Sequence, residues 1–157
     1  MGTFAVQLAH WKGAYVITTS SGANLDFLRG LGADQTIDYS IQPHFEDQLR
    51  DIDVVLDAVG GDTVQRSWTV LRRGGYMVSI TKPIPEQDFR EHNARGLFFI
   101  VEPNRDQQEE MAKLIDDGSL KTFVASIFPL ARARQAFELG LQGHTPGKIV
   151  LEVRDHA

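Results

Sequence analysis

The sequence of 157 residues contains no cysteine. This absence excludes disulfides, thiolate nucleophiles and cysteine-ligated zinc, and it is typical of proteins that work in a reducing compartment. We therefore predict a cytoplasmic location.

Basic residues are also scarce, because 16 Lys and Arg face 21 Asp and Glu, which gives a formal net charge of -5. A surface for nucleic acid or anionic lipid would need clustered basic side chains. No apolar run approaches the roughly 20 residues of a membrane helix, and the first residues lack the pattern of a secretory signal. We predict a small-molecule substrate, with neither nucleic acid nor membrane as partner.

Several catalytic motifs are missing. The sequence has neither a GxSxG nucleophile elbow nor a phosphate-binding Walker lysine loop. The histidines have no metal-ligand spacing, so we predict no metal site; they are His10, His44, His92, His144 and His156. No residue is nominated as catalytic, and the catalytic group stays unknown.

What is present is 42% hydrophobic residues, enough for a core, arranged in alternating strand and helix patterns. We expect strands over 15–19, 35–37, 52–57, 76–80, 97–101, 122–128 and 149–153. Helices are expected over 4–11, 25–31, 63–71 and 106–117 and after Pro129, with a short one around Phe45 and Leu49. This alternation predicts one α/β domain over 1–157, with a doubly wound, mostly parallel sheet.

Ligands of such folds bind beyond the carboxyl ends of the strands. Gly2 and Thr3 open a helix whose free N–H groups favour a phosphate, although an ordinary helix start explains them equally. Thr19, Ser20 and Ser21 end a strand without an acid, and hydroxyls there tolerate a 2′-phosphate that a carboxylate would repel. The alternative is that Ser20 or Ser21 caps the next helix.

Two further strand ends are candidates. Asp57 ends an apolar strand and is followed by small residues that allow close approach of a ligand; its carboxylate can equally anchor loop amides. Ser79 and Ile80, together with 98–101, could wall a flat ring, although the Phe pair can equally be core.

Taken together, the segments GTFAVQLA, NLDFLRGLGADQTIDYS, DVVLDAVGGDTVQRSWTVLRRGGYMVSI, FFIVEP and GKIVLEV resemble the medium-chain dehydrogenase/reductase superfamily. The branch they are similar to is the NADPH:quinone oxidoreductase-like one, often labelled zinc-binding dehydrogenase although many of its members bind no zinc. This resemblance implies a Rossmann-like fold with NADP(H) as cofactor.

The resemblance also implies roles for the strand ends. Gly2 and Thr3 would face the pyrophosphate, and Ser20, Ser21 and Tyr39 would surround the adenosine 2′-phosphate. The whole set of predicted cofactor-binding residues is Gly2, Thr3, Thr19, Ser20, Ser21, Tyr39, Asp57, Val59, Gly60, Ser79, Ile80, Phe98, Phe99, Ile100 and Lys148. Lys148 is the weakest candidate, since a surface lysine beside the last strand explains it as well.

Relatives of this kind carry a GroES-like N-terminal domain and a first Rossmann strand, and neither has a counterpart in this sequence. We therefore expect an N-terminally truncated chain in which residues 120–157 would normally pack on the catalytic domain. The predicted function is the NADPH-binding part of an oxidoreductase that transfers hydride to a quinone or an activated enone or carbonyl. The alternative is a non-catalytic module that self-associates through open sheet edges, and a homodimer through 97–101 is compatible with both.

Overall fold

The computed structural model describes residues 1–143 and 146–153. The α-helices are α1 (Gly2–Trp11), α2 (Leu25–Gly30), α3 (Asp62–Val70), α4 (Glu86–Glu91), α5 (Arg105–Asp116) and α6 (Ala133–Leu141). Short 3-10 helices lie at η1 (Gly22–Asn24), η2 (Phe45–Asp47) and η3 (Leu130–Arg132). The strands are β1 (Ile17–Ser20), β2 (Gln35–Asp38), β3 (Ile52–Asp57), β4 (Leu71–Ser79), β5 (Arg95–Phe98), β6 (Val124–Pro129) and β7 (Lys148–Glu152).

All strand pairs in the described ranges are parallel, which confirms the predicted α/β class. The strands form three sheets, however, with the orders β1-β2, β3-β4-β5 and β6-β7. In the described part of the chain, β1 pairs only with β2, and β3 pairs only with β4, so each of these two strands keeps one open edge.

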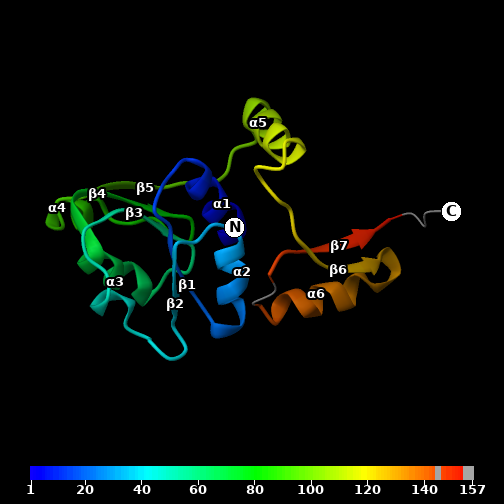
Figure 1. Cartoon of the computed structure of the whole chain (residues 1–157), viewed down its shortest axis with the longest axis horizontal. Helices are drawn as coiled ribbons and strands as arrows, with labels where there is room; N and C mark the ends of the chain where they lie inside the picture. The colour runs from blue at the N-terminus through cyan, green and yellow to red at the C-terminus, as the bar shows by residue number, and fades with distance from the viewer. Residues whose placement is uncertain (144–145, 154–157) are drawn as a thin grey trace.

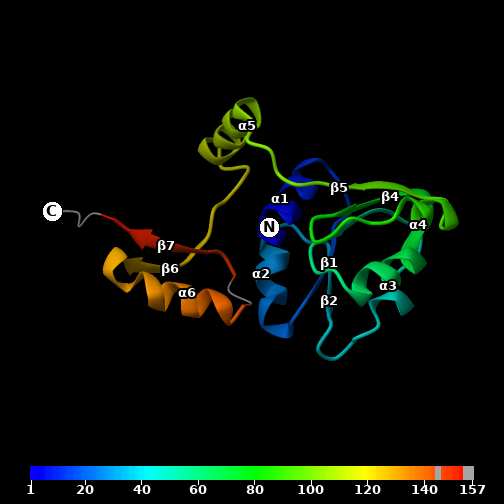
Figure 2. The same cartoon turned by 180° about the vertical axis from the view of Figure 1, so that it is seen from behind.

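Figures 1 and 2 show how these sheets are arranged. Helices α1 and α2 lie in the middle of the molecule, between β3–β5 with α3 and α4 on one side and β6, β7 and α6 on the other. Helix α5 stands apart above the connection between the two sides. The first two sheets and their helices therefore form one body, to which residues 120–153 are attached through α1 and α2.

The core consists of three clusters of buried side chains. One joins α1 to the turn before β2 through Val6, Val16, Leu31 and Ala33. The second joins β1 to β3, because Ile17 and Val55 both pack on the group that contains Ile37 and Phe45. This shared cluster holds the first two sheets side by side even though no sheet ladder joins them in the described residues.

Several predicted elements differ in detail. The strand expected over 97–101 is wrong in its position, because β5 covers Arg95–Phe98 and ends where its partner β4 ends, at the Ser79–Phe98 pair. Beyond that pair Ile100 and Val101 are 75% and 80% exposed. β3 has the predicted bounds but is not a buried strand, since Val54 and Leu56 are 60% and 42% exposed.

Helix α1 begins at Gly2 and ends at Trp11, with Val6 and Gln7 buried and Trp11 42% exposed. Val6 packs in one cluster with Val16, Leu31 and Ala33, and the Phe123 side chain packs against the same cluster.

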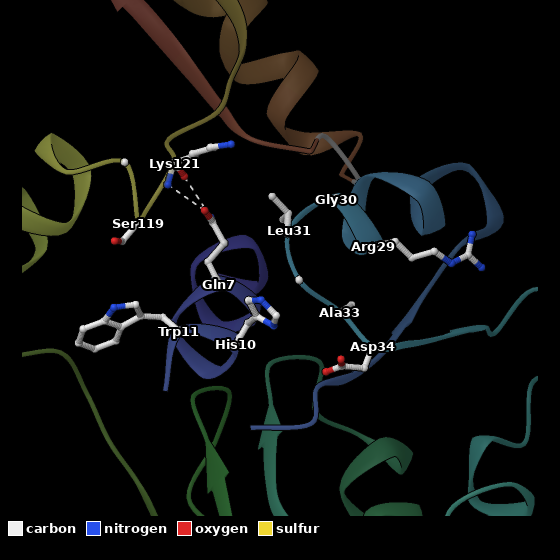
Figure 3. A pocket seen from close by; sticks show the side chains of 12 residues that line it. Gln7, His10, Trp11, Arg29, Gly30, Leu31, Ala33, Asp34, Ser119 and Lys121 are labelled. Carbon is white, nitrogen blue, oxygen red and sulfur yellow. Dashed lines mark hydrogen bonds between the residues drawn. The ribbon is translucent and has the colours of Figure 1, made fainter. Parts of the chain in front are cut away.

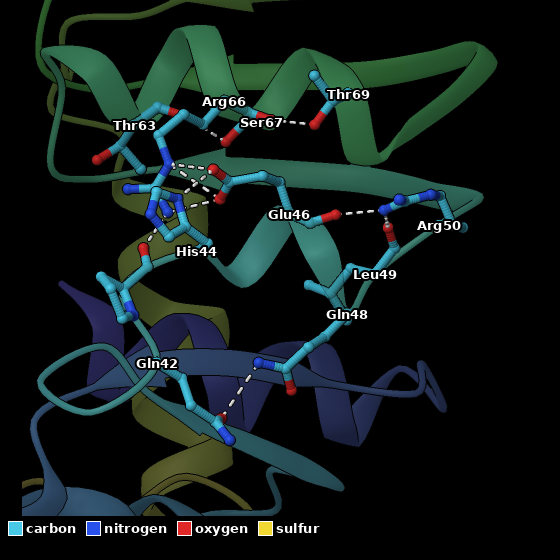
Figure 4. Close-up of polar contacts among 11 residues, drawn as sticks. Gln42, His44, Glu46, Gln48, Leu49, Arg50, Thr63, Arg66, Ser67 and Thr69 are labelled. Atoms are coloured by element: carbon cyan, nitrogen blue, oxygen red, sulfur yellow. Dashed lines mark hydrogen bonds and ion pairs between the residues drawn. The ribbon is translucent and has the colours of Figure 1, made fainter.

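A polar clasp fixes the connection between β2 and β3. The Arg66 guanidinium on α3 donates to both carboxylate oxygens of Glu46, with Nε 2.9 Å from each, and also to the carbonyl of Pro43 (Figure 4). The same guanidinium lies 4.5 Å from the centre of the Phe45 ring. Hydrogen bonds from Arg66 hold the pKa of Glu46 at about 2, below its usual 4.5.

Candidate functional site

The carboxyl ends of β3 and β4 are tied together by the side chain of Asp57. This carboxylate is only 2% exposed. One oxygen accepts from the backbone N–H of Gly60 at 2.9 Å and of Val59 at 3.3 Å, and the other accepts from the hydroxyls of Ser79 and Thr81, each at 3.0 Å. The interpretation that Asp57 anchors loop amides is therefore confirmed, and the loops after both strands are held in one arrangement.

The turn after β3 depends on a glycine. Gly60 has a φ of +80°, a conformation that L side chains rarely adopt, and a Cβ there would lie 2.9 Å from Thr81 Oγ1. The backbone of this turn thus rests directly on the Thr81 side chain. Thr81 was not predicted as a site residue from the sequence. The available signal was its spacing of two residues from Ser79, which places both hydroxyls on one side of an extended segment.

The carboxyl ends of β1 and β2 form a second group. The backbone N–H of Tyr39 donates to the carbonyl of Ser20 at 3.1 Å, which brings Ser20, Ser21 and Tyr39 to one edge. Ser21 precedes η1, and its carbonyl, not its hydroxyl, accepts the capping bond from the N–H of Asn24. The predicted side-chain cap of the following helix is therefore not seen in the described residues.

Sequence reasoning missed Asp38, which lies at the same edge. Its carboxylate accepts from the hydroxyl of Ser40 at 2.5 Å and from the backbone N–H of Ser40 at 2.9 Å, and these bonds lower the pKa of Asp38. A Cβ on Gly22 would lie 2.5 Å from the Asp38 carboxylate. An acid directly after the apolar Ile37 was the available signal, because it ends the strand at the ligand-facing edge.

Helix α1 begins at Gly2, and Met1 before it supplies no side-chain cap within the described residues. The carbonyl of Met1 accepts from the N–H groups of Phe4 and Ala5. The amides of Gly2 and Thr3 thus lie at the positive end of a helix of ten residues, where they can meet an anion.

The structure brings most of the predicted residues to strand ends. Asp57, Val59, Gly60, Ser79, Ile80, Phe98 and Phe99 follow or end neighbouring strands of the β3-β4-β5 sheet. Lys148 begins β7 in a different sheet, opposite Val124, and no described contact joins its side chain to either group.

A described cavity lies elsewhere, with a volume of about 560 Å³. Its walls come from the C-terminal half of α1, the turn 29–34 and residues 118–121, and Figure 3 shows Arg29 pointing away from the His10 ring. The walls from α1, from the turn 29–34 and from residues 118–121 precede β1, β2 and β6 respectively, so the cavity lies away from the carboxyl ends of these strands. The cavity and the strand ends are separate features.

The structure also tests whether a metal fits. Among the described residues, no three His, Asp or Glu side chains lie together as a metal site; His144 and His156 fall outside the described residues. Within the same residues, no helix has the length and apolar character needed to cross a membrane.

Parallel strands joined by helices, with clustered polar loops at their carboxyl ends, define a Rossmann-like nucleotide-binding fold. The chain belongs to the zinc-binding dehydrogenase family, whose profile matches residues 31–151. This membership confirms the resemblance to the medium-chain dehydrogenase/reductase superfamily.

Individual relatives agree. The chain is 33% identical to a quinone oxidoreductase from Coxiella burnetii, with a TM-score of 0.89, and covers 49% of that protein while 98% of this chain is matched. It is 33% identical to the NADPH-dependent alkenal/one oxidoreductase, chloroplastic, of Arabidopsis thaliana, with 96% of this chain and 37% of the relative covered.

A probable zinc-binding oxidoreductase, mitochondrial, of Arthroderma benhamiae is 28% identical, with 98% of this chain and 49% of the relative covered. The chain thus spans about half the length, or less, of the curated relatives it matches. Their names place two of them in organelles, so the cytoplasmic location of this chain stays a prediction.

Proposed function

We propose that the chain is the NADP(H)-binding part of an oxidoreductase that transfers hydride to a quinone or to an activated enone or carbonyl. The observation that carries this proposal is the Asp57 network, which fixes two neighbouring loops at the carboxyl ends of parallel strands. Relatives named as a quinone oxidoreductase and as an NADPH-dependent alkenal/one oxidoreductase support the same reaction class.

When bound, NADPH supplies the hydride, and the chain binds and orients the cofactor. The N-terminus of α1 would face the pyrophosphate through the amides of Gly2 and Thr3. Ser20, Ser21 and Tyr39 would surround the 2′-phosphate, since their two strand ends are bonded together.

The second loop group would hold the other half of the cofactor. The Val59–Gly60 turn would contact the ribose and adenine side, and Ser79 and Ile80 would approach the nicotinamide. Ser79 is fully buried, and its hydroxyl donates to Asp57 and accepts from the N–H of Thr81, so Ser79 would act by fixing the backbone that carries Ile80. Phe98, Phe99 and Ile100 would border the ring, with Phe99 and Ile100 supplying exposed apolar surface.

Titration of the purified chain with NADPH and with NADH, followed by cofactor fluorescence, tests the cofactor. We expect saturable NADPH binding, and Ser21→Glu should weaken it by about tenfold while sparing NADH, because a carboxylate repels the 2′-phosphate. Ser119→Glu, at an exposed position far from the strand ends, is the matched control. Equal loss for both cofactors, or no saturation by either, would refute the proposal, and a quinone added to the NADPH complex then measures turnover.

We also propose that residues 120–157 pack on a catalytic domain, which is supported by their exposed apolar side chains. Ile127, Phe137 and Leu141 are 63%, 69% and 71% exposed. Residues 144–145 and 154–157 of this segment lie outside the described residues. We further propose a homodimer through 97–101. The exposed apolar side chains of Ile100 and Val101, which follow β5, support it.

A second candidate, a non-catalytic module that self-associates, is favoured by one observation. β1 and β3 each keep an open edge in the described chain, and open edges pair with other chains. Absence of cofactor binding together with a concentration-dependent mass would favour this candidate over the first.

A further inference from the structure

A buried amide side chain on α1 contacts the distant C-terminal part of the chain. Gln7 is only 5% exposed. Its Nε2 donates to the carbonyl of Lys121 at 3.1 Å and to that of Thr3 at 2.9 Å, while its Oε1 accepts from the N–H of Lys121 at 2.8 Å (Figure 3). The Gln7 side chain therefore forms hydrogen bonds with both the N–H and the carbonyl of Lys121, as the backbone of a neighbouring strand would.

The residues around Lys121 are fixed by packing as well. Leu120 is 2% exposed, and the Phe123 ring meets the Phe27 ring of α2 edge-to-face at 4.9 Å. Phe123 also packs on the cluster that contains Val6 of the same helix α1. The segment 120–123 is thus held against α1 and α2, and the Gln7 bonds are its polar part.

The same segment sets the position of β7. The N–H of Lys148 donates to the carbonyl of Phe123 at 2.8 Å. Gly147 lies so close that a Cβ there would be 2.7 Å from that carbonyl oxygen. Its φ of +116° is a conformation that any other residue would adopt only with strain. Hydrogen bonds therefore connect Gln7, through the backbone of 121–123, to Lys148, the cofactor candidate that lies in the β6-β7 sheet.

We propose that Gln7 is a positioning residue that fixes the segment 120–124 and, through it, Lys148 relative to the helix whose N-terminus faces the cofactor. The part that concerns Lys148 and the cofactor rests on the proposed function. The part that concerns the segment itself does not.

Hydrogen exchange of the chain without cofactor tests the segment. In Gln7→Leu, which removes every bond but keeps the volume, the amides of 121–124 and Lys148 should exchange at least about tenfold faster, while those of 52–57 stay unchanged. Lys121→Ala is the matched control, because only its backbone takes part and its side chain is exposed.

Unchanged exchange in Gln7→Leu, or equal acceleration in Lys121→Ala, would overturn the proposal. Should Gln7→Leu lose protection over 52–57 as well, Gln7→Glu replaces it. That variant keeps an acceptor for the N–H of Lys121 but has no donor for the two carbonyls, so acceleration confined to 121–124 and Lys148 is again expected. Unchanged exchange there in Gln7→Glu would overturn the proposal equally.

NADPH titration of a double-mutant cycle tests the link to Lys148. Lys148→Ala should weaken binding by about threefold in the original chain and leave it unchanged in the Gln7→Leu background, because the side chain is no longer held in place. Additive losses would overturn this link. No NADPH saturation of the original chain would instead refute the proposed function, and the exchange experiment alone would then decide the role of Gln7.

Discussion

The Asp57 carboxylate is buried with four hydrogen-bond donors around it, two from backbone and two from hydroxyl groups. Buried donors that lose their acceptor cost free energy, because water cannot reach them. The residue therefore stabilises the fold and shapes the candidate site at the same time.

We predict that Asp57→Ala lowers the free energy of unfolding by about 2–3 kcal/mol, since the N–H of Gly60 and the hydroxyl of Ser79 are left buried without their acceptor. Urea denaturation followed by fluorescence of the buried Trp68, which packs with Met77 of β4, measures this change. The control is Asp53→Ala, whose exposed ion pair with Arg72 contributes about 0–1 kcal/mol. Equal losses in the two variants would contradict the prediction.

The clasp between Glu46 and Arg66 has a defined pH dependence. Hydrogen bonds from Arg66 lower the pKa of Glu46 to about 2, so the stabilisation is complete above the ordinary pKa of 4.5 and is lost as the pH falls toward 2. We predict that Glu46→Gln costs about 1 kcal/mol at neutral pH and progressively less at acid pH. Urea midpoints of both proteins across this range provide the measurement, and a constant difference would count against it.

At the scale of single elements, Gly96 determines how β5 docks on β4. A Cβ at this position would lie 1.9 Å from the carbonyl oxygen of Met77 and 2.6 Å from the Phe89 ring of α4. A Cβ at this position would clash with the backbone of β4 and with a side chain of α4, so a side-chain rotation alone cannot make room for it.

We predict that Gly96→Ala destabilises the chain by about 1–3 kcal/mol, as overpacking does elsewhere. Thermal unfolding followed by circular dichroism checks this value. Gly30→Ala serves as control, because a Cβ there meets nothing within 4 Å. The idea fails if the two variants melt at the same temperature.

The elements also show what the sequence could predict. β3 was found with its correct bounds, because a run of apolar residues ending in Asp57 and small residues defines both its body and its end. β5 was misplaced, since the apolar 97–101 run continues past the point where β4 stops offering hydrogen bonds.

The candidate site was predicted unevenly for similar reasons. The end of a strand can be predicted where an apolar run gives way to polar or small residues, and Asp57 and Ser79 were predicted in this way. Thr81 was missed, because its importance comes from a hydrogen bond to Asp57 that only the folded chain defines, whereas Asp38 was missed although its place after the apolar Ile37 was a usable signal. The role of Gln7 on α1 was missed because its partner, the backbone of Lys121, lies more than 100 residues away.

At the scale of the whole molecule, the open edges of β1 and β3 predict self-association at high protein concentration. A charge on an exposed strand position opposes such pairing, so Val54→Lys should shift the mass in sedimentation toward the monomer. Ile41→Lys, at an exposed position outside the sheets and outside 97–101, should leave the mass unchanged. Dissociation by Val101→Lys alone would instead indicate association through 97–101.

The division into three sheets also affects how the chain melts. Backbone ladders make a domain unfold in a single cooperative step when they are continuous, and here the described ladders stop at β1, β3 and β6. In the described chain, the β6-β7 unit follows the short 120–123 segment, which contacts α1 through Gln7 and α2 through Phe27. Calorimetry should therefore give a measured enthalpy larger than the van't Hoff value, with the β6-β7 unit melting first.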